Sequence, residues 1–168
     1  MPTMRTIKCE IAQPSALLAD FVESFWMLQN LSDREHHIVV VPDGRVDIIF
    51  SLAPTETFQA TLKGLDTELD RAVIAANTVF FAISFKLLGV EYLLRELVGN
   101  IRNRGMVLPS AFWGITPADL TDFDLFCTKA SCHMLTLVKP TIDDRKRELF
   151  KLIYQANGTA KVQDLGLG

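Results

Sequence analysis

The chain has 168 residues, of which 49% are hydrophobic and 22% charged, and its formal net charge at neutral pH is −3. These values are typical of one folded domain with a hydrophobic core, and they exclude an intrinsically disordered chain. The negative net charge argues against a broad nucleic-acid-binding surface, because phosphate binding needs clustered Lys and Arg side chains.

The sequence gives no sign of a membrane or export segment. No apolar run approaches the roughly 20 residues of a membrane-spanning helix, and residues 1–8 lack the apolar core of a secretory signal. The cysteines, Cys9, Cys127 and Cys132, are odd in number and have neither zinc-finger nor redox-motif spacing. We therefore expect a cytoplasmic protein with reduced thiols and no membrane partner.

The first half of the chain, up to about Phe85, is predicted to form β-strands. In residues 6–11, Ile7, Cys9 and Ile11 share one side and Lys8 and Glu10 the other, which predicts a half-buried strand. Further strands are expected at residues 24–28, 57–62, 71–76 and 78–85.

Two runs rich in β-branched residues, 36–41 and 46–50, flank the segment Pro42-Asp43-Gly44-Arg45. Pro presets φ for a turn, Asp can accept a hydrogen bond from the turn backbone, and Gly tolerates a left-handed conformation. The pattern predicts a β-hairpin.

After about Gly89 the spacing of apolar residues becomes helical. We expect helices at residues 89–98, 116–139 and 141–157, with a short extended piece at 106–109. Thr116-Pro117 is typical of a helix start, with a capping residue followed by Pro at the first helical position. The predicted class is α+β, with an N-terminal antiparallel β-sheet or cupin-like barrel followed by C-terminal helices.

Several landmarks follow one another in a recognisable order. They are Pro14, Leu17, Leu18, Phe21, Val22, the pair Phe25-Trp26, the segment 41–50, the strand 80–86 with its Phe85-Lys86 end, and the helix start at 89–94. This order resembles the N-terminal domains of AraC-family transcriptional regulators. One departure is Leu87-Leu88-Gly89, where those domains commonly have Pro-Gly after the basic residue.

The resemblance implies a β-rich sensing domain at residues 1–156, with a helical dimerisation region within residues 120–155. Residues 157–168 resemble a linker and the start of a helix-turn-helix DNA-binding domain, and the alternative is an ordinary frayed tail. Since no recognition helix follows, we expect DNA binding only through a C-terminal domain that is absent from this chain.

Two groups of residues raise the question of a metal site. His36 and His37 precede Asp43 and Asp47, but adjacent strand residues point to opposite faces, so a solvated His and a turn-stabilising Asp are favoured. Cys127 and Cys132 would lie about 140° apart around a helix, which favours thiols in the core over metal ligands. We expect no metal and no cofactor.

The chain is not expected to be an enzyme. It has no Gly-rich phosphate loop, no Gly-x-Ser-x-Gly and no His-Glu-x-x-His motif, although catalytic residues can also converge from distant positions.

An apolar, aromatic sheet can instead enclose a small-molecule pocket. The family landmarks suggest Phe25, Trp26, Arg45, Asp47 and Phe85 as ligand-binding residues, with simple core packing as the alternative, above all for Phe25 and Phe85. If Arg45 or Asp47 is buried, it needs a partner, and either a polar ligand or the other of these two residues would serve.

The predicted function is therefore the ligand-sensing or dimerisation domain of an AraC-like regulator, with a small-molecule effector and a homodimer as its partners. The alternatives are a stand-alone cupin-like small-molecule-binding protein or enzyme, and a purely structural dimer module.

Overall fold

The structure is a computed structural model that describes residues 6–96, 98–139, 141–156 and the single residues 159, 161 and 163. The chain divides into two compact units, residues 1–137 and 138–168. Most of the segment 157–168, where the sequence predicts a linker and the start of a DNA-binding domain, lies outside the described residues. Within the described ranges, no helix has the length and apolar character needed to cross a membrane.

The strands form one large antiparallel sheet and one small ribbon. Their bounds are β1 (Ile7–Ala12), β2 (Val22–Asn30), β3 (His36–Val40), β4 (Val46–Leu52), β5 (Gln59–Lys63), β6 (Asp70–Ile74), β7 (Val79–Phe85) and β8 (Gly105–Val107). The large sheet has the order β1-β2-β7-β4-β5-β8, while β3 and β6 pair with each other. The predicted α+β class and antiparallel sheet are confirmed, and the sheet is open, with β1 and β8 at its edges.

Helical segments occupy the second half of the chain. They are α1 (Leu87–Gly89), which continues as the π-helix η1 (Val90–Leu94), the 3-10 turns η2 (Val98–Asn100), η3 (Phe112–Gly114) and η4 (Pro117–Thr121), and the helices α2 (Phe123–Leu137) and α3 (Asp144–Gln155). The first of these helices was predicted at residues 89–98, but it begins at Leu87 and ends at Leu94, because Arg95 adopts a left-handed conformation. Leu97, which the prediction also includes, lies outside the described residues.

The predicted start at Thr116 is confirmed by a capping box. The Thr116 N–H and hydroxyl both donate to Asp119 Oδ2, at 2.7 and 2.8 Å. Lys129 on α2 donates to the same oxygen at 2.8 Å, so this cap also joins η4 to α2.

The predicted hairpin between residues 36–41 and 46–50 is wrong in its pairing. Both strands form, but β3 pairs with β6, and β4 pairs with β5 and β7. The turn itself has the expected chemistry: Gly44 has φ +73°, and the Arg45 N–H donates to Asp43 Oδ1 at 3.0 Å. The segment between them therefore carries the chain from the ribbon into the large sheet.

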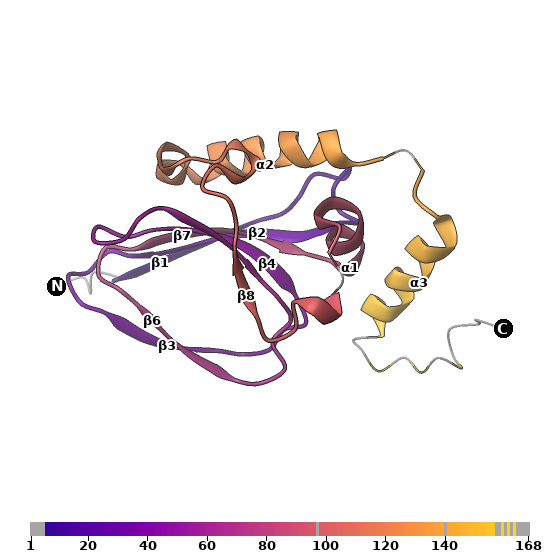
Figure 1. Cartoon of the computed structure of the whole chain (residues 1–168), viewed down its shortest axis with the longest axis horizontal. Helices are drawn as coiled ribbons and strands as arrows, with labels where there is room; N and C mark the ends of the chain where they lie inside the picture. The colour runs from indigo at the N-terminus through magenta and orange to yellow at the C-terminus, as the bar shows by residue number, and fades with distance from the viewer. Residues whose placement is uncertain are drawn as a thin grey trace. The chain divides into compact units, whose positions relative to one another are not determined.

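The two faces of the large sheet differ in what lies on them (Figure 1). Helix α2 runs along one face, which we call the helix face, and the ribbon of β3 and β6 lies on the side of the other, which we call the ribbon face. On the helix face, the rings of Phe25, Phe50 and Phe81 surround that of Phe126 on α2, with centroids 6.5, 5.6 and 5.3 Å away. These aromatic contacts form the centre of the core.

Candidate functional site

The ribbon face carries a row of polar side chains across four strands. Strand register aligns Ser84 on β7 with Asp47 on β4, and Asp47 in turn with Lys63 on β5. Ser24 on β2 extends this row, since it lies opposite Ser84. Because directly paired residues in an antiparallel sheet share a face, these four side chains project from the same side of the sheet.

The neighbouring row on the same face is mostly apolar. It aligns Ile11, Trp26, Ala82, Ile49 and Thr61 on five successive strands. Trp26 and Ile49 are half-buried, so the ribbon face combines accessible apolar surface with a few polar groups. This mixture is typical of small-molecule binding sites.

Asp47 is the central polar group of this face. Its half-buried carboxylate accepts a hydrogen bond from the Ser84 hydroxyl, at 2.5 Å. Burial raises the pKa of Asp47 to about 6, against the opposing effect of the Ser84 hydrogen bond; the charges of Asp43 and Asp66 raise it further, and that of Arg45 lowers it. Asp47 can therefore change its protonation state close to neutral pH.

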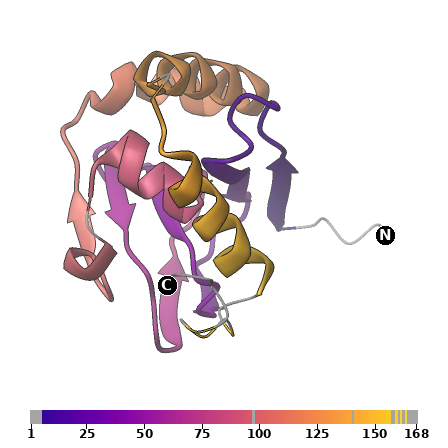
Figure 2. The same cartoon turned by 90° about the vertical axis from the view of Figure 1, so that its right-hand side faces the viewer.

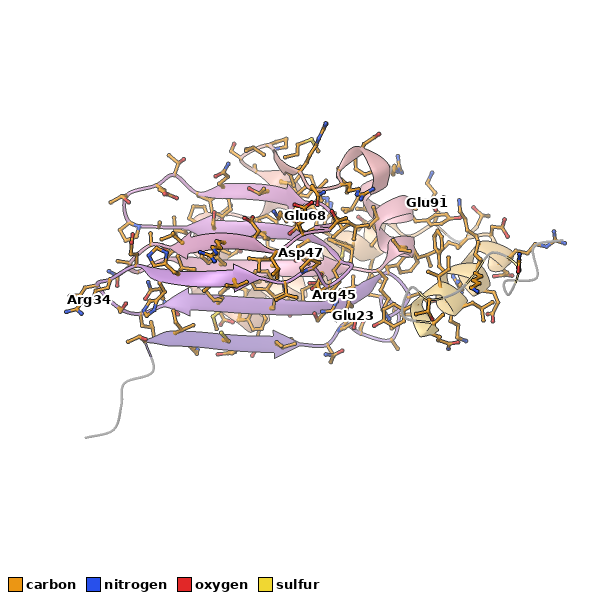
Figure 3. The ribbon with its side chains drawn as sticks, turned by 90° about the horizontal axis from the view of Figure 1, so that it is seen from below. Glu23, Arg34, Arg45, Asp47, Glu68 and Glu91 are labelled. Carbon is orange, nitrogen blue, oxygen red and sulfur yellow. The ribbon has the colours of Figure 1, made fainter. Side chains whose placement is uncertain are left out.

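Arg45 lies near Asp47 at one end of the sheet and pairs with a residue that the sequence analysis does not identify. Its Nη2 lies 3.5 Å from Glu23 Oε1, and its Nε lies 3.9 Å from Asp43 Oδ2. Lys86 approaches the other Glu23 oxygen at 3.8 Å. Figure 3 shows Asp47, Arg45 and Glu23 following one another across the strands. The ion-pair partners of the half-buried Arg45 are thus Glu23 and Asp43, and not Asp47, which was the protein partner expected from the sequence.

Lys63 adds a further cation to the same region. Its Nζ lies 3.2 Å from Asp66 Oδ1 and 3.8 Å from Asp70 Oδ2. We call Glu23, Arg45, Asp47, Lys63 and Ser84 the polar cluster. The polar cluster contains hydrogen-bond donors, hydrogen-bond acceptors and charges of both signs, and it lies next to Trp26. It can therefore orient a polar small molecule on the sheet.

The structure does not bring the five predicted ligand-binding residues together. Trp26 and Asp47 share the ribbon face and Arg45 lies at its end, but Phe25 and Phe85 project from the helix face. Both rings are buried: Phe25 packs against Phe126, and Phe85 lies 6.2 Å from the ring of Trp113. Their surroundings favour the core-packing alternative.

The polar cluster contains three residues that the sequence analysis missed. Glu23, Lys63 and Ser84 come from strands far apart in the chain, and only strand register aligns Lys63 and Ser84 with Asp47. The one local signal was Ser84, a polar residue inside the apolar run 79–85.

The groups considered as metal sites are dispersed. Among the residues that the structure describes, no three His, Cys, Asp or Glu side chains are placed to hold a metal ion. His36 lies 3.2 Å from the Ser32 hydroxyl, and His37 lies 3.3 Å from Glu35.

The predicted core position is wrong for Cys132, which is exposed, whereas Cys127 is half-buried. The reason is the orientation of α2, which turns Phe123, Phe126, Ala130 and Met134 inward.

Comparison with known families identifies one relationship. The family model described as a domain of unknown function (DUF6597) matches residues 10–106. This range includes the polar cluster and the Phe25-Trp26 pair. No curated protein and no solved structure matches the chain.

Proposed function

The chain belongs to the DUF6597 family of domains of unknown function, and on that premise we propose that it is the effector-sensing domain of a cytoplasmic, AraC-like transcription regulator. The effector is a small molecule that binds on the ribbon face of the sheet. The order of sequence landmarks from Pro14 to Leu94 supports the regulator class, because it resembles the sensing domains of that family.

The observation that carries the binding proposal is the environment of Asp47. Asp47 is a half-buried carboxylate next to Ser84, Arg45 and Lys63. Its charged form lowers the stability of the fold, because burial disfavours the charge. A ligand that donates hydrogen bonds to Asp47 compensates for this cost. Trp26, on the adjacent row, offers an apolar surface for the rest of the ligand.

Regulation further requires that the effector bind two arrangements of the protein with unequal affinity. We propose that helical residues 120–155 pair two protomers, so that helix-turn-helix domains of the full-length protein are placed on two DNA half-sites. Effector binding on the sheet would bias this pairing.

A thermal-shift screen of a metabolite library tests the binding site. Hits should stabilise the wild type by mass action and lose this effect in Asp47→Asn. The matched control is Asp33→Asn, because the Asp33 side chain is 93% exposed in the loop before β3, and it should respond like the wild type. Hits that stabilise Asp47→Asn as well as the wild type would place the binding site elsewhere.

Reporter transcription from the full-length protein tests the regulatory role. A genuine effector should change expression in the wild type and in Asp33→Asn, and have little effect in Asp47→Asn. The regulatory proposal would be refuted if deletion of the gene that encodes this protein left the expression of the target genes unchanged. This holds whatever the domain binds.

A further inference from the structure

An apolar cavity lies on the opposite side of the sheet from the polar cluster. Its volume is about 320 Å³, which falls in the lower part of the range for small-molecule pockets. The paired residues Ile48 and Leu62 line it from the helix face, and Leu93 and Leu94 line it from η1. Figure 2 shows the short helix of α1 and η1 beneath α2, toward the edge of the sheet that β8 forms.

The aromatic side of this cavity consists of Phe112 and Trp113. Their rings stack with centroids 5.0 Å apart, and the His133 ring of α2 lies 5.1 Å from the Trp113 ring. Both residues are half-buried, so they offer ring surface to a planar apolar group inside the cavity.

The backbone around the cavity is unusual at two of its lining residues. Arg95 has φ +57° and Trp113 has φ +54°, in the left-handed region that side chains of this size rarely adopt. The segment before Arg95 is a π-helix, a form that occurs frequently at functional sites.

Two adjacent charged residues also line the cavity. Arg95 is exposed and Glu96 is half-buried. Among the residues that the structure describes, neither side chain takes part in a hydrogen bond or an ion pair. The cavity therefore presents an apolar, aromatic interior together with one cation and one anion that are not neutralised by the described part of the chain.

We propose that this cavity binds an aromatic α-amino acid or a closely similar zwitterion. Its carboxylate would pair with Arg95, its ammonium group with Glu96, and its ring would pack against Phe112 and Trp113. A simple carboxylic acid would leave Glu96 without a partner, and a simple amine would leave Arg95 without one. The site is separate from the polar cluster, so it does not depend on the proposed effector site.

Fluorine NMR with 4-fluoro-L-phenylalanine as the probe tests this site directly. We expect the probe line to broaden and shift on titration with the wild-type chain. Arg95→Gly and Glu96→Gln should each weaken binding at least about tenfold, since each removes one charged partner. Arg95→Gly is suited to the test because glycine adopts positive φ without strain, so the fold is retained.

Two analogues test the zwitterion assignment. We expect 3-(4-fluorophenyl)propionate, which lacks the amine, and 2-(4-fluorophenyl)ethylamine, which lacks the carboxylate, to bind at least about tenfold more weakly than the amino acid. Asp47→Asn should bind the probe like the wild type, because Asp47 lies on the ribbon face. No binding by the wild type, equal binding of either analogue, or unchanged binding by both Arg95→Gly and Glu96→Gln would overturn the proposal.

Discussion

The Ser84 hydroxyl on β7 donates a hydrogen bond to the carboxylate of Asp47, its direct cross-strand neighbour on β4. The bond favours the charged form of Asp47, while burial favours the neutral form more strongly, so the pKa is raised from 3.8 to about 6. The pair therefore makes the stability of the folded protein dependent on pH.

Replacement of Asp47 by Asn should stabilise the protein at neutral pH. Because the folded-state pKa is raised, the folded protein retains a proton that the unfolded chain loses between about pH 4 and pH 6. The contribution of Asp47 to stability is thus fully present below pH 4 and is lost as the pH rises through 6. A pKa of about 6 instead of 3.8 corresponds to at most about 3 kcal/mol. Urea denaturation from pH 4 to 7 measures the difference.

In that series, Asp47→Asn should approach wild-type stability near pH 4 and exceed it increasingly toward pH 7. Asp33→Asn, with its exposed side chain, should follow the wild type throughout. A difference between Asp47→Asn and the wild type that is the same at every pH would contradict the raised pKa.

Removal of the Ser84 hydroxyl should raise the pKa of Asp47 above 6, because the hydrogen bond that stabilises the carboxylate is lost. Ser84→Ala should also destabilise the protein at neutral pH by about 2 kcal/mol, the typical contribution of a hydrogen bond to a charged group. A carboxyl carbon NMR titration reads the pKa directly. Ser51→Ala, at a half-buried position on the same face of β4, is the matched control and should leave the titration of Asp47 unchanged.

Replacement of Asn30 by Leu should destabilise the fold by about 3 kcal/mol. The fully buried Asn30 amide donates to the carbonyls of Arg34 and Ala75, at 2.7 and 2.9 Å, and its oxygen accepts from the Ser32 N–H at 3.0 Å. Leu leaves these backbone groups unsatisfied, which costs about 1–3 kcal/mol for each buried group. Thermal or urea denaturation measures the loss. Gln13→Leu, at an exposed position after β1, should have little effect, and equal stability of the two variants would refute the role of Asn30.

Addition of a methyl group at Gly64 should destabilise the chain by about 3 kcal/mol. A Cβ at this position would lie 1.5 Å from the carbonyl oxygen of Ile101, so the backbone has to move to admit it. Gly99→Ala is the matched control, since nothing lies within 4 Å of a Cβ there. The comparison requires only the denaturation midpoints of the two variants. Equal stability of Gly64→Ala and Gly99→Ala would refute the close approach of Gly64 to the carbonyl group of Ile101.

The three thiols should react with iodoacetamide at different rates. Burial raises the pKa of Cys127 to about 12, with the charge of Asp124 acting in the same direction, and the thiolate is the reactive form. Cys9 and Cys132 are exposed. Mass spectrometry of timed samples should therefore show Cys9 and Cys132 modified before Cys127. Early modification of Cys127 in the folded protein would contradict its burial and its raised pKa.

Features that depend on contacts within a few residues could be predicted from the sequence alone. The turn at Pro42-Asp43-Gly44-Arg45 and the capping box at Thr116 have the predicted chemistry, because the interacting groups lie two or three residues apart. Strands β1 to β7 likewise lie close to their predicted ranges, since alternation in residues 6–11 and runs rich in β-branched and aromatic residues elsewhere favour strands. The half-buried side predicted for β1 is wrong, because Cys9 and Ile11 on that side are exposed on an edge strand.

Only the tertiary structure decided which segments meet. The sequence predicted that β3 would pair with β4, but β3 pairs with β6, because a turn signal defines a reversal of the chain and not the partner of each strand. It could not show that Asp47 would face Ser84, 37 residues away, or that Phe25 would face away from its neighbour Trp26 into the core. These relationships depend on strand register and on the packing of α2, and both are set by contacts between segments far apart in the chain.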